Sequence, residues 1–291
     1  MKLHTSIILD LLRVRQWTKN LLIFAAIIFV NKLFDPAYFL KVITGFFLLS
    51  FAASSIYIIN DLKDAKEDKH HPEKKLRPIA SGVIGQEFAS GLCAILMLVS
   101  LAGSFLISVN FFFVILAYII MMVLYTLSLK HIVILDVFII AAGFVIRAVS
   151  GAVIINVAIS PWFLICTSLA ALFMALAKRR YELSSVADPS KHRKILLEYS
   201  VPLLDEMISV VTSSTVIAYS LYTFTSKTGE SHNYLMYTIP FVLYGIFRYL
   251  YLIHKKNLGG SPEMILLKDK PLLINIIIYS IFVVAIVYFV K

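Results

Sequence analysis

The segment Asn60–Gly82 reads NDLKDAKEDKHHPEKKLRPIASG and is the densest block of charge in a largely apolar chain. Directly after an apolar run, Asp61, Asp64 and Asp68 recur at positions i, i+3 and i+7. On a helix these positions fall within roughly 60° of one another, so the three carboxylates share one face. Clustered carboxylates suit Mg²⁺, which takes oxygen ligands and usually keeps water and substrate phosphates as its others. The spacing therefore predicts that Asp61, Asp64 and Asp68 are metal ligands.

The second half of this segment is basic, with Lys74, Lys75 and Arg77 following the carboxylates. Cationic side chains bind phosphate through charge-assisted hydrogen bonds, and Arg77 is our candidate for that role. Asn60 precedes the first carboxylate and offers an amide oxygen that a metal ion can use. The alternative is a solvated loop beside the membrane. The carboxylate spacing favours a metal–diphosphate site at the end of a membrane helix.

Composition indicates the class of protein. The chain has 291 residues, of which 60% are hydrophobic and 15% charged, and its mean hydropathy is +0.87. A soluble domain cannot bury that much apolar surface, so we predict a polytopic membrane protein. Cys93 and Cys166 lie in apolar runs and show neither disulfide nor zinc spacing, so we interpret both as buried apolar side chains.

Nine apolar runs indicate nine membrane-spanning helices in one all-α domain, a helical bundle over residues 1–291. The first run is short and reaches membrane length only if it tilts or extends back to Trp17. Asp205 is interpreted as the N-cap of the seventh span. The runs cover residues 21–34, 37–59, 87–107, 111–128, 135–157, 162–177, 205–224, 234–253 and 271–288. The cytoplasmic loops are expected at about residues 60–86, 129–134, 178–204 and 254–270.

The distribution of Lys and Arg predicts the orientation of this bundle. With the N-terminus inside, the cytoplasmic segments hold about 21 of these residues and the outer segments about 4, as the positive-inside rule requires. The net charge of +10 is thereby explained without nucleic acid as a partner. We expect an integral protein of a bacterial-type plasma membrane. Its N-terminus and active site would face the cytoplasm, and its C-terminus the outside.

The acidic segment resembles the first aspartate-rich motif of the UbiA superfamily of intramembrane prenyltransferases. His71-Pro72 and the run RPIASG at residues 77–82 are similar to the sequence that follows this motif in the family. Members are helical bundles of about nine spans, with a Mg²⁺–diphosphate cavity that opens at the cytoplasmic side. The resemblance implies Mg²⁺ as cofactor and a fold that agrees with the hydropathy pattern.

The second long polar loop departs from the family pattern. Most members carry another aspartate-rich motif there, whereas this chain has KRRYE at residues 178–182 and then Asp188 alone. Lys178 and Glu182 are four residues apart and share a face if the helix continues. One alternative is a cluster that only snorkels to the membrane surface. The other, which we prefer, is that Lys178 and Arg179 are catalytic and bind phosphate directly. The ligands would then carry more phosphate than a prenyl diphosphate alone.

This pattern resembles one branch of the superfamily, the decaprenyl-phosphate phosphoribosyltransferases. The branch implies 5-phosphoribosyl-1-diphosphate as donor, a polyprenyl phosphate as acceptor and a role in cell-wall biosynthesis. Further stretches similar to the branch are residues 15–20 (RQWTKN), 125–130 with Asp136, 143–148, 222–224, 248–249, 260–263 (GSPE) and 268–271 (KDKP).

Other polar residues in or beside the spans are assigned to substrate binding. Ionisable groups inside a span are costly and usually face a cavity. Asp136 and Arg147 lie on one predicted helix about 16 Å apart along its axis, too far to neutralise each other. Each either lines the site or pairs with a neighbouring helix. The candidate substrate-binding residues are Lys19, Asn60, Arg77, Tyr125, Lys130, Asp136, Arg147, Glu182 and Arg248.

The implied reaction needs no general base, because the phosphate of the lipid is already anionic at neutral pH. Catalysis by Asp61 and Asp64, through Mg²⁺, and by Lys178 and Arg179 would stabilise the leaving diphosphate and offset the repulsion between two anions. One alternative is a UbiA-type prenyltransferase acting on an aromatic acceptor, which the missing second aspartate motif disfavours. Another is a transporter of an anionic metabolite, which the one-sided charge disfavours. A homo-oligomer is left open.

Overall fold

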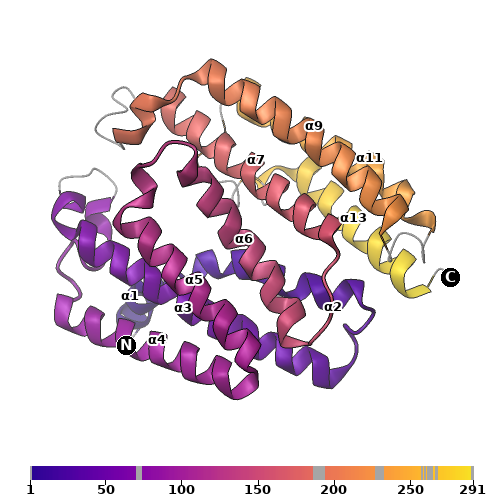
Figure 1. Cartoon of the computed structure of the whole chain (residues 1–291). Helices are drawn as coiled ribbons and strands as arrows, with labels where there is room; N and C mark the ends of the chain where they lie inside the picture. The colour runs from indigo at the N-terminus through magenta and orange to yellow at the C-terminus, as the bar shows by residue number, and fades with distance from the viewer. Residues whose placement is uncertain are drawn as a thin grey trace. The chain divides into compact units, whose positions relative to one another are not determined.

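The computed structural model describes residues 2–69, 74–185, 194–226, 233–256, 258, 260, 265 and 268–289. Within these residues the chain is helical and forms no β-strand, and eight helices are long and apolar enough to cross a membrane. Figure 1 follows the helices from α1, near the N-terminus, to α13, at the C-terminus. The all-α membrane fold that hydropathy predicts is therefore confirmed.

The chain divides into two compact units, here called unit 1 (residues 1–127 and 146–158) and unit 2 (residues 128–145 and 159–291). Labels with η denote 3₁₀ helices. Unit 1 contains α1 (Lys2–Leu11), η1 (Val14–Phe24), α2 (Ala25–Phe29), α3 (Pro36–Asp68), η2 (Lys74–Leu76), α4 (Gln86–Ile107) and α5 (Val109–Leu127). Unit 2 contains η3 (Leu129–His131), α7 (Pro161–Ser185), η4 (Lys194–Glu198), α9 (Val201–Thr225), η5 (Asn233–Thr238), α11 (Ile239–Lys255) and α13 (Lys270–Phe289). Helix α6 (Leu135–Ile154) begins in unit 2 and ends in unit 1. The single domain expected over the whole chain stays a prediction.

Helix α3 carries the acidic segment on an uninterrupted helix. Asp35 caps its start, where the carboxylate accepts the backbone N–H of Ala37 at 3.1 Å and Pro36 takes the first helical position. The helix runs for 33 residues to Asp68. That is about 50 Å, against about 30 Å for the hydrocarbon core of a bilayer. Its last turns therefore extend beyond the core, and the loop expected from residue 60 begins as helix.

The first apolar run begins within a 3₁₀ helix, η1, and continues as the short α-helix α2, which ends at Phe29. Helix η1 has 11 residues and α2 adds 5. Because a 3₁₀ helix rises about 2.0 Å per residue, the two together cover about 30 Å, enough for the hydrocarbon core. The run expected at residues 21–34 thus reaches membrane length by starting earlier, at Val14, and by tighter winding. With the eight longer helices it is consistent with about nine spans.

The 3₁₀ winding places polar groups of η1 in register with α3. Trp17 Nε1 donates to Ser54 Oγ at 3.0 Å, and Asn20 Nδ2 donates to Ser50 Oγ at 2.9 Å. Three residues of a 3₁₀ helix and four of an α-helix both rise about 6 Å, so the two bonds repeat at matching heights. Because unpaired polar groups are costly away from water, this match favours the unusual winding.

Unit 2 packs α7 against α9, and α11 against α9 and α13. Its core includes Leu176, Leu204 and Ile208, each at most 1% exposed. The prediction that Asp205 caps the seventh span is wrong. Helix α9 begins four residues earlier, where the Ser200 hydroxyl accepts the backbone N–H of Leu203 at 3.3 Å and proline occupies the first turn. Ser200, with Pro202 in the first turn, is the preferred N-cap, so Asp205 lies inside the helix.

The close approach of α6 to η1 in unit 1 gives a test of this packing. A Cβ atom on Gly151 would lie 1.9 Å from the Ile23 carbonyl oxygen, whereas a Cβ on Gly91 would meet nothing within 4 Å. We expect Gly151→Ala to lower the free energy of unfolding by about 1–3 kcal/mol, because backbone cannot move aside as a side chain can. Gly91→Ala should be neutral or stabilising by about 0.5–1 kcal/mol. Thermal unfolding in detergent measures both, and equal melting temperatures would contradict the packing.

Candidate functional site

Two carboxylates at the end of α3 are joined by guanidinium groups within unit 1. Arg77 Nη1 donates to Asp61 at 3.0 Å and to Asp68 at 2.5 Å, and Arg13 donates to the same oxygen of Asp61. Asp61 and Asp68 are each 3% exposed. A buried carboxylate is costly unless cations and hydrogen bonds compensate it. Arg77, expected to bind phosphate, thus bridges two of the three expected metal ligands.

The third carboxylate of α3, that of Asp64, is less buried and bonds to its own helix. Asp64 is half-buried, and its Oδ2 accepts the Asn60 side-chain amide at 3.1 Å, one turn earlier on the helix. The carboxylates therefore share the end of α3, as predicted. The structure separates a buried pair, Asp61 and Asp68, from a more accessible group, Asp64 with Asn60.

Arg13 is a site residue that sequence reasoning missed. Its backbone is left-handed, with φ 50°, which is uncommon for a residue other than glycine. This conformation turns the chain between α1 and η1. The guanidinium lies 5.0 Å from the centre of the Tyr57 ring and contacts Asp61. No local pattern marks this partner, because 48 residues separate Arg13 from Asp61.

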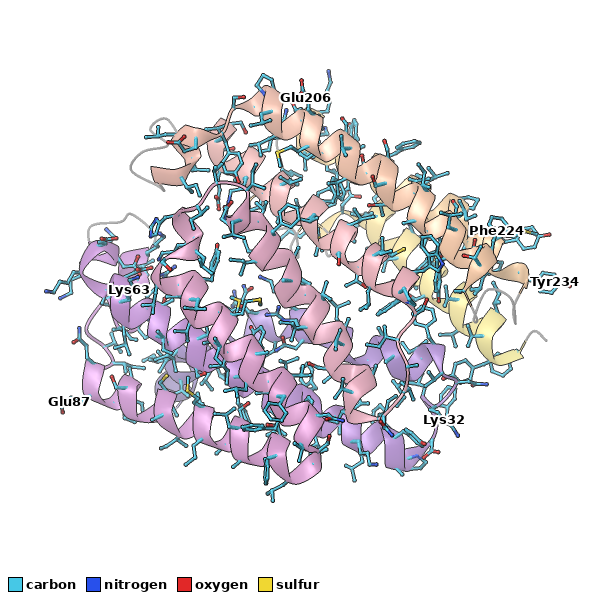
Figure 2. The ribbon with its side chains drawn as sticks, in the orientation of Figure 1. Lys32, Lys63, Glu87, Glu206, Phe224 and Tyr234 are labelled. Atoms are coloured by element: carbon cyan, nitrogen blue, oxygen red, sulfur yellow. The ribbon has the colours of Figure 1, made fainter. Side chains whose placement is uncertain are left out.

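Lys63 is another residue without an assigned role that the structure explains. It lies on the acidic turns of α3, and its ammonium donates to the carbonyls of Thr126 at 2.9 Å and Leu127 at 3.1 Å (Lys63 is labelled in Figure 2). These are the last carbonyls of α5, which lack partners within that helix, and a cation is favourable there. Lys63 therefore fixes the end of α5 beside the acidic end of α3.

Arg147 pairs with neighbouring helices of unit 1, the alternative that the sequence left open. Its Nε donates to Asn20 Oδ1 at 2.7 Å, and its Nη2 donates to the Tyr118 hydroxyl at 2.9 Å. The side chain is 5% exposed. Asn20 in turn donates to Ser50, so a continuous chain of hydrogen bonds joins α6, η1 and α3. Such a satisfied network stabilises the unit.

Unit 2 contains a buried charge cluster around Arg179, which is 1% exposed. Its Nε donates to Asp136 at 2.7 Å and its Nη1 to Glu182 at 2.6 Å. Helix α7 continues to Ser185, so residues 178–182 (KRRYE) are helical. Lys178 and Glu182 can share a helix face only because the helix continues through them. Asp136 pairs with a neighbouring helix, again the alternative that the sequence left open. Arg179, assigned to catalysis, is held between two carboxylates.

Tyr199 completes this cluster and was not identified from the sequence. Its hydroxyl donates to Asp136 Oδ1 at 2.7 Å and accepts the backbone N–H of Ile134 at 2.7 Å. Ile134 has φ 69°, a strained value for a β-branched residue. Burial, together with the hydrogen bond to Asp136, raises the pKa of the Tyr199 phenol well above its usual value. Tyr199 therefore stays a neutral donor that holds both the strained turn and Asp136.

Two further arginines of unit 2 form more exposed pairs. Arg180 pairs with Asp205, which also lies 3.2 Å from His254. Arg248, assigned to substrate binding, makes two hydrogen bonds to Asp269, at 3.0 and 2.8 Å. The hydrogen bond from Arg248 lowers the pKa of Asp269. Asp269 also accepts the backbone N–H of Leu272 and so caps α13.

The remaining assignments divide between the units or fall outside the described residues. Lys19 in η1 and Tyr125 in α5 are half-buried in unit 1, and Lys130 in η3 and Lys178 in α7 are half-buried in unit 2. Of the motifs quoted above, His71-Pro72, Asp188 and residues 261–263 lie outside the described residues.

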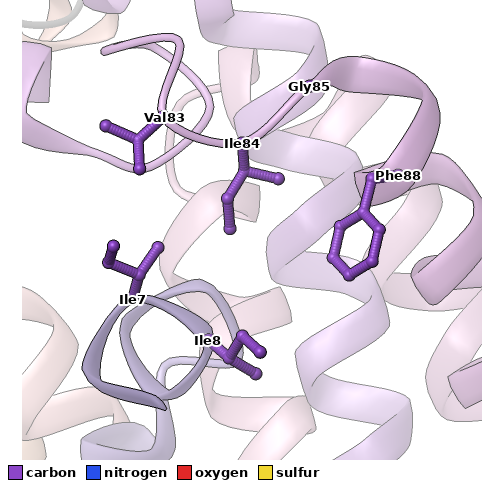
Figure 3. A pocket seen from close by; sticks show the side chains of 6 residues that line it. All are labelled: Ile7, Ile8, Val83, Ile84, Gly85 and Phe88. Atoms are coloured by element: carbon purple, nitrogen blue, oxygen red, sulfur yellow. The ribbon is translucent and has the colours of Figure 1, made fainter. Parts of the chain in front are cut away.

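Unit 1 also contains an apolar hollow of about 270 Å³ between α1 and the start of α4. Figure 3 shows Ile7 and Ile8 facing Ile84 and Phe88 across it. Its lining carries no ionisable side chain, so it lacks the groups for phosphate chemistry. We therefore place the candidate site at the charged clusters rather than in this hollow.

Comparison with known proteins identifies the family. A family model described as the UbiA prenyltransferase family matches residues 21–266. The chain belongs to the UbiA prenyltransferase family. It is 35% identical to a decaprenyl-phosphate phosphoribosyltransferase of Mycolicibacterium smegmatis, over 95% of this chain and 91% of that protein. It is 32% identical to a protein of the same name from Corynebacterium glutamicum, over 95% of this chain and 85% of that protein.

Solved structures confirm the UbiA fold. A UbiA homolog from Archaeoglobus fulgidus bound to GPP and Mg²⁺ is similar with a TM-score of 0.74 and 19% identity, covering 96% of this chain and 98% of that one. The structure of a UbiA homolog from the same organism bound to Cd²⁺ gives a TM-score of 0.71, at 18% identity and with the same coverage. At this identity the likeness concerns the fold alone.

The residues of this UbiA family member fit a hard cation by their chemistry. Among the described residues, no three His, Cys, Asp or Glu side chains converge on one point. Mg²⁺ is usually bound through one or two carboxylates plus water and substrate phosphates, so a preformed cluster of three is not required. Asp64 and Asn60 offer carboxylate and amide oxygens, with Asp61 one turn away. Metal binding by these residues stays a prediction.

The buried cluster of unit 2 gives the second test. Asp136→Ala should lower the free energy of unfolding by about 3 kcal/mol, because it leaves the buried Arg179 with one carboxylate fewer. Asp205→Ala removes the carboxylate that pairs with Arg180. The Asp205 side chain is 35% exposed. The substitution should cost at most about 1 kcal/mol. Thermal unfolding compares the two variants, and equal losses would show that burial does not control the strength of these pairs.

Proposed function

We propose that this chain is a Mg²⁺-dependent membrane phosphoribosyltransferase. A phosphate oxygen of a polyprenyl phosphate forms a bond to C1 of the ribose of 5-phosphoribosyl-1-diphosphate. The bond between C1 and the diphosphate oxygen breaks, and diphosphate leaves with the electron pair. The products are polyprenyl-phosphate-linked phosphoribose and diphosphate. No proton needs to be removed, because the attacking oxygen is already anionic.

Similarity along nearly the whole chain is the observation that carries this proposal. The proteins named decaprenyl-phosphate phosphoribosyltransferase match 90–95% of the chain at 32–35% identity. The cationic end of α7 supports the same reading. Lys178, Arg179 and Arg180 stand there in place of the carboxylates expected of a prenyl-diphosphate enzyme. Cations are suited to a reaction in which both substrates carry phosphate.

Unit 1 supplies the metal-binding part of the proposed chemistry. Asp64, Asn60 and Asp61 would hold the ion, with Asp68 as a further ligand. When bound, Mg²⁺ supplies charge neutralisation at the leaving diphosphate. Arg77 and Arg13 already lie against Asp61 and would turn toward a phosphate that enters beside it.

Unit 2 supplies cations for phosphate groups. Lys178 is half-buried at the end of α7, so its ammonium can meet a phosphate at the membrane surface. Arg179 is held by Asp136 and Glu182, and its position is therefore set before any substrate binds. Fixed charges of this kind stabilise the leaving group without the cost of reorganising solvent. By the positive-inside distribution, these groups face the cytoplasm, where the soluble donor occurs.

Asp64 gives the cleanest test of metal binding, because it is half-buried, whereas Asp61→Ala would disrupt buried pairs with Arg13 and Arg77. We expect Asp64→Asn to lower the transfer rate at least about a hundredfold and to abolish the thermal stabilisation by donor that depends on Mg²⁺. Glu67→Gln, an exposed acidic position three residues further along the same helix, is the matched control. It should behave as the unchanged protein. Retention of the Mg²⁺-dependent stabilisation in Asp64→Asn would refute the ligand assignment.

Substrate choice is tested separately with the purified protein. It should release diphosphate from 5-phosphoribosyl-1-diphosphate only when polyprenyl phosphate is present. Geranyl diphosphate with an aromatic acid should give no product. Reaction of that second pair in place of the first would make this chain a prenyltransferase in the ordinary sense and overturn the proposal.

A further inference from the structure

Unit 2 contains a groove of about 240 Å³ whose walls come mainly from one face each of α7, α11 and α13, with Thr215 of α9 completing the lining. On α13, the lining residues are Leu272, Asn275, Ile276 and Tyr279, at the i, i+3, i+4 and i+7 spacing of a single helical face. On α11, Val242 and Gly245 line it at the same kind of spacing. On α11 the groove extends from Phe241 to Tyr249, which is eight helical steps of about 1.5 Å, so it is about 12 Å long. It therefore runs along the helices rather than across them.

Three polar side chains of this groove, those of Asn275, Tyr279 and Thr215, are already bonded to the protein, Thr215 through the carbonyl of Val211 at 2.7 Å. Asn275 Nδ2 donates to the carbonyl of Phe241 at 3.0 Å. The Tyr279 hydroxyl lies 3.1 Å from the Tyr219 hydroxyl, which also bonds to Thr238. What these side chains present to the groove is mainly ring and aliphatic surface. A ligand in it gains by burying hydrocarbon, so the groove suits an apolar chain.

One end of the groove lies toward the helix ends that carry Lys178, Lys255 and Lys270, with the Arg248–Asp269 pair at the same ends of α11 and α13. Lys178 follows Met174, a lining residue, by four positions, so it lies on the same face about 6 Å further along α7. Helix α11 ends at Lys255 and α13 begins at Lys270. The rings of Phe173 and Tyr249 are 5.0 Å apart, which places these ends of α7 and α11 at one level. An apolar chain in the groove would thus carry an anionic head group at its cationic end.

We propose that this groove holds the first isoprenoid units of the acceptor polyprenyl phosphate, with the lipid phosphate at the cationic ends of α7, α11 and α13. The inference rests on the proposed function and assigns it a lipid subsite. Charge complementarity at one end and hydrocarbon along the length match the two parts of this lipid. The groove is much shorter than a long polyprenyl chain, so the remaining units lie in the bilayer.

A pair of identical substitutions tests the assignment. Val242→Trp fills the groove, whereas Val210→Trp places the same ring on the outer face of α9, where Val210 is 67% exposed. We expect Val242→Trp to raise the KM for decaprenyl phosphate at least about tenfold, because the ring displaces several buried methylene groups of the lipid. Val210→Trp should leave that KM unchanged. Both variants should keep the thermal stabilisation by 5-phosphoribosyl-1-diphosphate and Mg²⁺, which reports the donor site and the fold.

Gly245→Leu provides a second variant if Val242→Trp fails to fold. A Cβ at Gly245 meets only the Asn275 side-chain amide, at 3.4 Å, so the new side chain fits the helix and projects into the groove. It should raise the KM for decaprenyl phosphate in the same way. An unchanged KM in the folded groove variants, with transfer by the unmodified protein intact, would overturn the groove assignment alone. No transfer by the unmodified protein would overturn the proposed function.

Photolabelling separates the acceptor from ordinary bilayer lipid. A polyprenyl phosphate with a photoreactive group near its phosphate should label peptides from α11 or α13. Decaprenyl phosphate should compete with this labelling, and phosphatidylglycerol should not. Equal competition by phosphatidylglycerol would show a groove for general membrane lipid. Labelling confined to the hollow beside α1 would place the tail elsewhere. Either result contradicts the assignment.

Discussion

Burying charge at the ends of membrane helices is the constraint on which this structure depends. Arg179 is 1% exposed and Asp61 3%, and an ion in such a place is stable only beside opposite charge. Arg179 is flanked by two carboxylates, and Asp61 by two guanidinium groups. Each unit therefore brings helices and loops together around one central ion. The same contacts that neutralise the ion also fix its position.

In the proposed reaction, each ligand that binds these clusters would replace a protein group of the same charge. Around Asp61, a cation at the carboxylate would substitute for a guanidinium, and a phosphate beside Arg13 or Arg77 would substitute for a carboxylate. The local charge then stays balanced as substrate enters, which limits the cost of binding in a medium of low dielectric constant. In unit 2 the cation is held more firmly, because Tyr199 fixes Asp136 and the strained backbone of Ile134 at once. Arg179 is thereby pre-organised.

Backbone geometry matters as much as charge in unit 1. Three residues of the 3₁₀ helix η1 rise about 6 Å, as do four residues of the α-helix α3. Trp17 therefore meets Ser54, and Asn20 meets Ser50. Gly151 lets α6 approach the backbone of η1 closely enough for Arg147 to reach Asn20. A short apolar run thus becomes a full-length element through its neighbours. No propensity within residues 21–34 indicates this winding.

The sequence by itself determined the class of fold, the main spans and the acidic and basic segments, because hydropathy and the i, i+3, i+7 spacing of Asp61, Asp64 and Asp68 are local properties of the chain. The sequence left open whether Asp136 and Arg147 line a site or pair with other helices, and it missed Arg13 and Tyr199. Only the tertiary structure shows which partners these four residues contact, because the partners are 29 to 127 residues apart in sequence. The start of α9 at Ser200 is different, because it follows a local Ser–x–Pro pattern that the assignment of Asp205 overlooked. Which opposite charges meet depends on helix packing, and no local pattern records it.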